Sequence, residues 1–407
     1  MGIHILKETS TPAQHVWIRV VGFGVLIAAA VFWMGLRGAD LRNLGPALTL
    51  WIGALAAVGL IVNKRRKFLL TIAGLFLSLG VVETTMLAYE EFVKAPAKKY
   101  SYEANVPPGW IADHRLVGYA FRGPVELLAT ATIGNNVIYE GVPYQIDDRS
   151  RRPCAAVQHP TRHALFFGGS FAFGEGLSND QTLGCQFQKI SGGEYESTTY
   201  AMMGWGAAQA LIELGVDSLF ADIKEPSGIA VFAFIDDHIY RTTWKIDTAS
   251  DFADYPFFSS KENGALEGPF RASDRWTLGL KLGFFGFLRT VSPTFRNLVK
   301  PSWFRITSDV QAVITTARVL GAARKLYRAR FDGEFIVLLW PRSRLDSLLE
   351  DLFVDELANL DVPIILVPAL PGDPERAQLH PKDGHPSSEE TAWVARALYE
   401  EVLTRNY

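Results

Sequence analysis

The stretch that decides the fold runs from Ala164 to Gly176 and reads Ala-Leu-Phe-Phe-Gly-Gly-Ser-Phe-Ala-Phe-Gly-Glu-Gly. Its apolar residues, followed by two glycines and a serine, predict a buried strand that ends in a tight turn. Ser170 then lies at the carboxyl end of the strand, which is the edge of an open α/β sheet where ligands bind. These residues alone leave two interpretations open: a reactive serine, or an ordinary strand-to-helix turn with a capping serine.

Strands and helices alternate after this stretch. The expected strands are 197–201, 229–235, 334–340 and 362–368, and the expected helices are 207–220, 308–330, 345–360 and 388–403. Strands that are apolar throughout and alternate with helices indicate a parallel sheet covered on both faces. We therefore expect an α/β fold over residues 153–407, a flavodoxin-like doubly wound sandwich of three layers, with an insertion at about 242–307.

The overall charge of the chain indicates no electrostatic partner. The 407 residues carry a formal charge of -3, and the basic residues are dispersed apart from one short run. This pattern excludes a nucleic-acid footprint. Apolar residues make up 48% of the chain, and their excess lies before residue 90, so the amino-terminal part belongs to a different structural class.

Three apolar stretches predict a membrane domain at 1–94. They cover 16–36, 46–62 and 68–89, each close to the roughly 20 residues that cross a bilayer, and no signal-peptide cleavage site follows the first. The basic run 64–67 joins the second and third stretches, so the positive-inside rule predicts a cytoplasmic amino terminus. The α/β domain is then expected on the periplasmic, extracytoplasmic side of the cytoplasmic (inner) membrane. Expected partners of the spans are membrane lipids and other membrane proteins.

Residues 95–152 predict a tether followed by a small β-rich lead-in. Prolines among lysines and tyrosines mark the tether, and short apolar runs separated by glycines follow it. No chemistry is assigned to this segment. We expect it to cover one side of the α/β domain.

Cys154 and Cys185 are the only cysteines. A disulfide between them is permitted outside the cytoplasm, and two unpaired buried cysteines are an equal alternative. Two cysteines without CxxC spacing, together with scattered histidines, do not supply a zinc ligand set. We therefore expect no metal.

Small and polar residues stand where the predicted strands end. Gly169 and Ser170 follow the first strand, Gly204 follows the second, Asp236, Asp237, His238 and Arg241 follow the third, and Asp383 and His385 precede the last helix. Because the carboxyl ends of parallel strands meet along one edge, we expect these residues to line one site.

The order of these residues resembles that of the SGNH hydrolase superfamily of GDSL-like esterases and acyltransferases. Gly168-Gly169-Ser170 is similar to the first block of the family, with glycine where many members have aspartate. Gly204 is similar to the second block, Asp236 and Asp237 to the Gly-x-Asn-Asp of the third, and Asp383 and His385 to the last. The resemblance covers about residues 160–405 and not the predicted membrane part.

The resemblance implies serine chemistry without a metal or organic cofactor. Ser170 would be the nucleophile, His385 the general base that takes its proton, and Asp383 the acid that fixes the imidazole tautomer. The backbone N–H groups of Ser170 and Gly204 would receive the oxyanion, each contributing about 3 kcal/mol when well aimed.

This sequence departs from the family pattern at two places. Asp236 stands where the family supplies an asparagine donor to the oxyanion hole, and an ionised carboxylate there repels an oxyanion. Either Asp236 is protonated or it points away, and Arg241 either adds compensating positive charge, as His238 would, or forms a salt bridge with Asp236 or Asp237. The second departure is spacing, because one residue instead of two separates Asp383 from His385. Asp383 is then the orienting acid or a structural turn residue.

Two functions of different classes follow. The first is a membrane-anchored extracytoplasmic serine esterase or O-acyltransferase that forms an acyl-enzyme at Ser170. The resemblance implies O-acyl groups, such as acetyl groups, of envelope glycans or lipids as its substrates. The second is a catalytically reduced SGNH-like subunit or docking module of a membrane protein complex. Asp236 favours the second, whereas the presence of Ser170, Asp383 and His385 together favours the first.

Overall fold

The residues that carry the fold are described by a computed structural model of the chain. The described residues are 66–92, 98–103, 110–243, 255–271, 284, 287–289, 291–298, 307–341 and 346–407. The chain divides into two units, Met1–Ala95 with Leu280–Trp303 and Pro96–Gly279 with Phe304–Tyr407. All the strands described below lie in the second unit.

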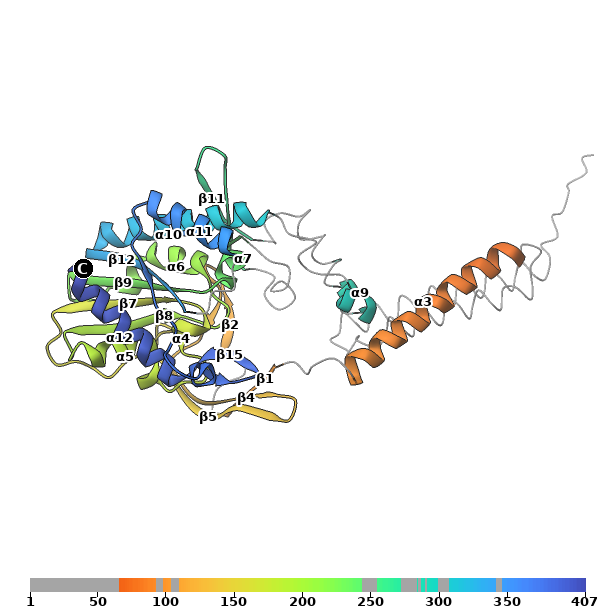
Figure 1. The fold of residues 1–407 in the computed structure, drawn as a ribbon, viewed down its shortest axis with the longest axis horizontal. Helices are drawn as coiled ribbons and strands as arrows, with labels where there is room; N and C mark the ends of the chain where they lie inside the picture. The colour runs from red at the N-terminus through yellow and green to blue at the C-terminus, as the bar shows by residue number, and fades with distance from the viewer. Residues whose placement is uncertain are drawn as a thin grey trace, which may run out of the picture. The chain divides into compact units, whose positions relative to one another are not determined.

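A mixed six-stranded sheet forms the centre of the second unit (Figure 1). Its order is β13 (Ile364–Leu366), β12 (Asp332–Leu339), β9 (Ser227–Phe234), β7 (Arg162–Gly168), β8 (Tyr195–Ala201) and β6 (Arg152–Pro153). The first five strands are parallel, and β6 runs antiparallel to β8 at the edge. Numbered along the chain, the parallel strands have the order 2-1-3-4-5, which is the flavodoxin-like order. The predicted α/β fold is confirmed, and the antiparallel edge strand adds to it.

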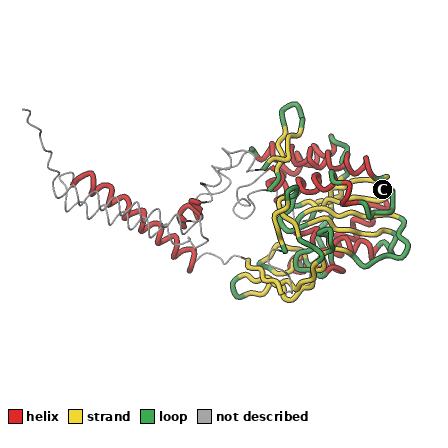
Figure 2. The backbone as a smooth tube through the Cα atoms, turned by 180° about the vertical axis from the view of Figure 1, so that it is seen from behind, coloured by secondary structure: helices red, strands yellow, loops and turns green. Residues whose placement is uncertain are grey.

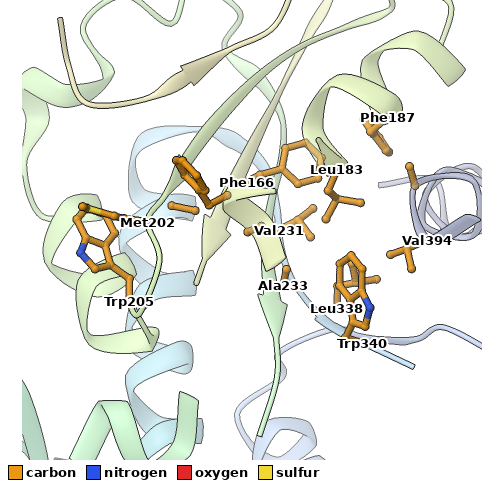
Figure 3. Close-up of a cluster of buried hydrophobic side chains, with 14 of the residues drawn as sticks. Phe166, Leu183, Phe187, Met202, Trp205, Val231, Ala233, Leu338, Trp340 and Val394 are labelled. Carbon is orange, nitrogen blue, oxygen red and sulfur yellow. The ribbon is translucent and has the colours of Figure 1, made fainter. Parts of the chain in front are cut away.

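Helices cover both faces of this sheet (Figures 1 and 2). On one face lie α5 (Leu183–Ile190) and α12 (Ser388–Arg405), and on the other lie α6 (Ala207–Leu214), α10 (Asp309–Arg330) and α11 (Ser347–Asn359). Successive residues of β7 point to opposite faces. Phe166 therefore joins the first core, with Leu183 and Val394 (Figure 3), and Phe167 joins the second. Burial on both faces explains why the strands are apolar at every position.

The predicted elements agree with the observed ones within two residues at each end, with one exception. The helix expected at 207–220 ends at Leu214, where Gly215 caps it, and a separate 3₁₀ turn, Asp217–Phe220, follows. Helical spacing continues across Gly215, but its amide hydrogen bonds close the last turn and the chain leaves the axis there.

The β-rich lead-in packs on the face that carries α5 and α12. An antiparallel sheet joins β1 (Lys98–Glu103), β4 (Val125–Ile133) and β5 (Asn136–Ile146), and β2 (Ile111–His114) pairs with β3 (Gly118–Phe121). Phe121, Leu127 and Tyr144 belong to the first core. Strand β1 lies within the stretch expected to be a tether and pairs with β4 along its whole length.

The expected insertion is divided between the two units. It supplies the hairpin of β10 (Phe257–Ser260) and β11 (Leu266–Phe270) to the second unit. In the first unit, α9 (Pro293–Leu298) packs on α3 (Arg66–Phe92), where Arg296 Nη2 lies 2.7 Å from Glu90 Oε2 and the Ser292 hydroxyl donates to Glu83. Residues 280–303 therefore group with the amino-terminal part of the chain and not with the α/β domain.

Of the three predicted spans, only the third lies within the described residues. Among the helices of the described residues, none is long and apolar enough to cross a membrane. The third expected span, 68–89, lies within α3 and finds no support there. The first two, 16–36 and 46–62, lie outside the described residues.

A disulfide joins Cys154 to Cys185, so the bonded alternative for the two cysteines is the one observed. It joins the residue that follows β6 to helix α5, and α5 packs on the core that contains Phe166 and Phe187. The bond closes a loop over a sequence separation of 31 residues, which includes β7 and residues 168–176, called the serine turn below.

We expect the double substitution Cys154→Ser with Cys185→Ser to lower the free energy of unfolding by about 3 kcal/mol, because the unfolded chain regains the freedom of the closed loop. Urea unfolding followed by tryptophan fluorescence measures this change. Wild type treated with a reductant is the matched control and should unfold at the same urea concentration as the double variant. A reduced wild type as stable as the oxidised one would contradict the expectation.

Candidate active site

Ser170 is the first residue of the short helix α4 (Ser170–Phe173), which follows the carboxyl end of β7 after Gly169. Gly168 has a φ of 143°, and Gly174 caps α4 in the left-handed region with a φ of 77°. The carbonyl of Ser170 accepts hydrogen bonds from the N–H groups of Gly174 and Glu175, at 2.9 and 3.0 Å. As the first residue of α4, Ser170 has an N–H that the helix itself cannot satisfy.

A buried arginine holds this turn in place. Arg152, in β6, donates to the carbonyl oxygens of Phe173, Gly174 and Leu177 at 2.8 to 2.9 Å, and its guanidinium stacks on the Tyr144 ring. Burial lowers the pKa of Arg152 to about 10, so the side chain stays charged at neutral pH. The sequence gives no signal for this role, because Arg152 belongs to a two-residue edge strand.

The structure brings Ser170, His385 and Asp383 together. His385 Nε2 lies 2.9 Å from Ser170 Oγ, and His385 Nδ1 lies 2.8 Å from Asp383 Oδ1. Both Asp383 and His385 belong to β15 (Asp383–Pro386), where side chains two residues apart point to the same side. The strand conformation therefore explains how a single intervening residue suffices, and Asp383 contacts the imidazole.

The Asp383 carboxylate stays ionised. Burial raises its pKa, but the hydrogen bond and charge of His385 and the ammonium of Lys98 outweigh this effect and lower the pKa to about 2. An ionised Asp383 accepts the Nδ1–H of His385, which leaves Nε2 of a neutral imidazole free to accept the Ser170 proton.

Sequence reasoning missed three residues that surround this triad. Lys98 Nζ lies 2.8 Å from Asp383 Oδ2 and 2.7 Å from Glu175 Oε1. The Tyr100 hydroxyl donates to the same Glu175 oxygen at 3.0 Å, and Glu175 Oε2 lies 3.2 Å from His385 Nε2. Lys98 and Tyr100 come from β1, within the expected tether, and Glu175 lies in the serine turn itself.

Ser170 and His385 line a cavity of about 510 Å³. Its apolar lining comes from Phe171, Phe234, Leu339, Trp340 and Leu349, and its charged lining comes from Asp236, Asp237, Arg241 and Asp346. Carboxylates, aromatic rings and the serine therefore line the same cavity.

Of the residues predicted for the site after β9, Asp236, Asp237 and Arg241 line the cavity, whereas His238 does not. Arg241 Nη2 lies 3.3 Å from Asp237 Oδ2, and Arg241 Nη1 donates to the carbonyl of Trp205 at 3.2 Å. His238 is fully buried, and its Nδ1 accepts the Ile235 N–H at 3.2 Å. Burial and then the charge of Arg241 lower the pKa of His238 well below its usual value. Arg241 therefore supplies positive charge beside the cavity, and His238 does not.

The two glycines assigned to the site have different surroundings. A Cβ on Gly169 would lie 2.8 Å from Arg241 Nη1 and 2.9 Å from His238 Nε2, so a side chain at this position would force neighbouring atoms to shift. Gly204 has a φ of 83°, and its carbonyl accepts the Tyr255 hydroxyl. Gly204 is not among the described residues that line the cavity.

Comparisons with known proteins find structures with a similar fold but do not assign this chain to a family. No family model matches the sequence, and no curated protein matches it. The structure is similar to the psychrotrophic esterase EstA of Pseudoalteromonas sp. (10% identity, 60% of this chain and 98% of that chain, TM-score 0.34). It is also similar to a carbohydrate acetylesterase family member of Sinorhizobium meliloti (14% identity, 60% of this chain and 98% of that chain, TM-score 0.32). A third similar structure is the acetyl xylan esterase Est2A of Butyrivibrio proteoclasticus (10% identity, 77% of this chain and 86% of that chain, TM-score 0.34). At these identities and TM-scores, the likeness carries no argument about activity.

We expect Gly169→Ala to slow the reaction of Ser170 with a fluorophosphonate by about 10- to 100-fold, because a shift of the serine turn of about 1 Å misplaces the nucleophile. The new methyl group would also lie 3.0 Å from the Trp205 carbonyl oxygen, which no side-chain rotation relieves. Gly192→Ala is the control, because a Cβ on Gly192 would meet no atom within 4 Å and Gly192 lies in the turn before β8, at the opposite edge of the sheet from Ser170. Equal labelling rates for the two variants would show that Gly169 is not a constraint on the site.

Proposed function

We propose that this protein is a serine esterase or O-acyltransferase that works through an acyl-enzyme at Ser170. The observation that carries the proposal is the relay of two hydrogen bonds, 2.9 and 2.8 Å long, from Ser170 through His385 to Asp383 at a cavity. A serine hydroxyl becomes a nucleophile when an oriented imidazole accepts its proton, and this arrangement provides one.

The reaction follows from these contacts. Ser170 Oγ attacks the ester carbonyl carbon while its proton passes to His385 Nε2, and the imidazolium is stabilised by Asp383. The tetrahedral intermediate expels the alcohol, whose oxygen takes the proton from Nε2, and the acyl group remains on Oγ. Water or the hydroxyl of an acceptor then attacks the acyl-enzyme, gives its proton to Nε2, and the same proton returns to Ser170 as the acyl group leaves. No step needs a metal or an organic cofactor.

The oxyanion donors belong to the proposal. We assign the N–H group of Ser170, which lines the cavity, with the positive charge of Arg241 beside the cavity as a counterweight to Asp236. The N–H group of Gly204, which does not line the cavity, is assigned as the second donor from the family resemblance alone. Asp236 lines the cavity in the place where the resembled family has its asparagine, so in this assignment the carboxylate does not serve as an oxyanion donor.

The proposed substrates are O-acyl groups, such as acetyl groups, of envelope glycans or lipids. The lining of the cavity supports a sugar as the alcohol part of the ester, because carboxylates accept hydrogen bonds from sugar hydroxyl groups and the rings of Phe171 and Trp340 offer apolar faces. A membrane-anchored, extracytoplasmic position also belongs to the proposal. The disulfide supports it, since such bonds persist in oxidising compartments, and the apolar stretches 16–36 and 46–62 of the sequence, which lie outside the described residues, support the anchor.

We expect a fluorophosphonate to label the detergent-solubilised full chain and to leave Ser170→Ala unlabelled, because Ser170 is the only serine held by an oriented imidazole in the described residues. Mass spectrometry of the labelled peptide measures the site. Ser227→Ala, at the amino end of β9, is the matched control and should label like wild type. A folded wild type that takes up no label would sink the esterase proposal and favour the docking module.

A further inference from the structure

A second carboxylate lies against the imidazole of the triad. Glu175 is 2% exposed, and its Oε2 is 3.2 Å from His385 Nε2, the same nitrogen that lies 2.9 Å from Ser170 Oγ. The other ring nitrogen, Nδ1, is hydrogen-bonded to Asp383. His385 therefore stands between two carboxylates, and Glu175 is on the side where the Ser170 proton arrives.

The serine turn fixes the position of Glu175. Its N–H donates to the carbonyl of Ser170 at 3.0 Å, so the two residues are tied by their backbones. Gly174 and Gly176 flank it with φ angles of 77° and 78°, which L side chains rarely adopt, and the Gly176 N–H donates to the Tyr144 hydroxyl. The side chain is held as well, because Lys98 Nζ and the Tyr100 hydroxyl both donate to Oε1. Glu175 Oε2 is thus held facing the imidazole.

The charges of the cluster balance only when His385 is protonated. The charged groups that contact the imidazole are Asp383 from β15, Glu175 from the serine turn and Lys98 from β1. Tyr100 of β1 donates to Glu175, and Tyr139 of β5 lies against Lys98. Burial raises the pKa of both tyrosines, which remain neutral. Two carboxylates and one ammonium leave one net negative charge beside a neutral imidazole. The imidazolium formed by the Ser170 proton cancels this charge.

We propose that Glu175 is a positioning residue for the serine reaction: its carboxylate stabilises the His385 imidazolium, and Lys98 limits how much negative charge the imidazole experiences. The inference rests on the proposed function, because it concerns the same proton transfer from Ser170 to His385. Once the proton has moved, the Nε2–H lies between Ser170 Oγ and Glu175 Oε2 until the departing oxygen takes it.

The test is the pH dependence of the fluorophosphonate labelling rate in the full chain. Labelling needs a neutral imidazole, so the rate rises with pH to a plateau. Glu175→Gln removes a charge that favours the imidazolium, and the midpoint of the rise should move down by about one pH unit. The plateau rate should fall about tenfold, because the proton acceptor is weakened. Lys98→Met removes the compensating cation, and its midpoint should move up.

Opposite shifts from two neighbouring substitutions separate an electrostatic role from a structural one. Glu140→Gln and Lys99→Met, at exposed positions of β5 and β1, are the matched controls and should keep the wild-type midpoint. Glu175→Asp retains the charge and should keep its midpoint closer to wild type than Glu175→Gln does. Thermal unfolding shows which variants are folded.

The outcomes separate the role of Glu175 from the esterase activity on which it rests. A labelled wild type with unchanged midpoints in folded Glu175→Gln and Lys98→Met, or with midpoints that move in the same direction, overturns the role of Glu175 and leaves the esterase proposal standing. An unlabelled wild type overturns both. If Glu175→Gln does not fold, Lys98→Met decides alone: an upward shift supports the proposal, and any other result overturns it.

Discussion

The hydrogen bond between Ser170 Oγ and His385 Nε2 joins residues that are 215 positions apart, and the candidate site exists only while that bond can form. Its geometry depends on the sheet. Strand β7 lies next to the point where the strand order reverses, and the carboxyl ends of its neighbours meet there. A slip of one residue in β7 would exchange its two buried faces, so packing on both sides of the sheet fixes where Ser170 stands.

Much of the fold and the triad was predictable because their signals are local. Strands buried on both faces are apolar at every position, a glycine-rich turn marks the end of β7, and Ser387 begins α12 by capping the Glu390 N–H directly after Asp383 and His385. Knowing that parallel strands expose their carboxyl ends along one edge is then enough to place Ser170 and His385 near each other. The distances of 2.9 and 2.8 Å are beyond what such reasoning supplies.

The remaining residues of the site were not predictable because their partners are distant and their sequence surroundings are ordinary. Lys98 and Tyr100 lie in a polar stretch that resembles a linker, and only the pairing of β1 with β4 carries them to Asp383 and Glu175. The association of α9 with α3 is similar, since it depends on the contact of Arg296 with Glu90, 206 positions away. Periodicity reports which face of an element is buried and not which charged group it meets.

Buried charge gathers at the site but is not confined to it, since Arg151, Glu213 and Glu390 are buried as well. Removing an ion from water costs several kcal/mol even after relaxation, and apolar residues of similar size would often be more stable in its place. Arg152, Glu175 and Asp383 are nevertheless buried within the described residues, and all three contact the serine turn or the imidazole. Each charge holds a reacting group or compensates another, so the cluster acts as one unit around the proton that Ser170 gives up.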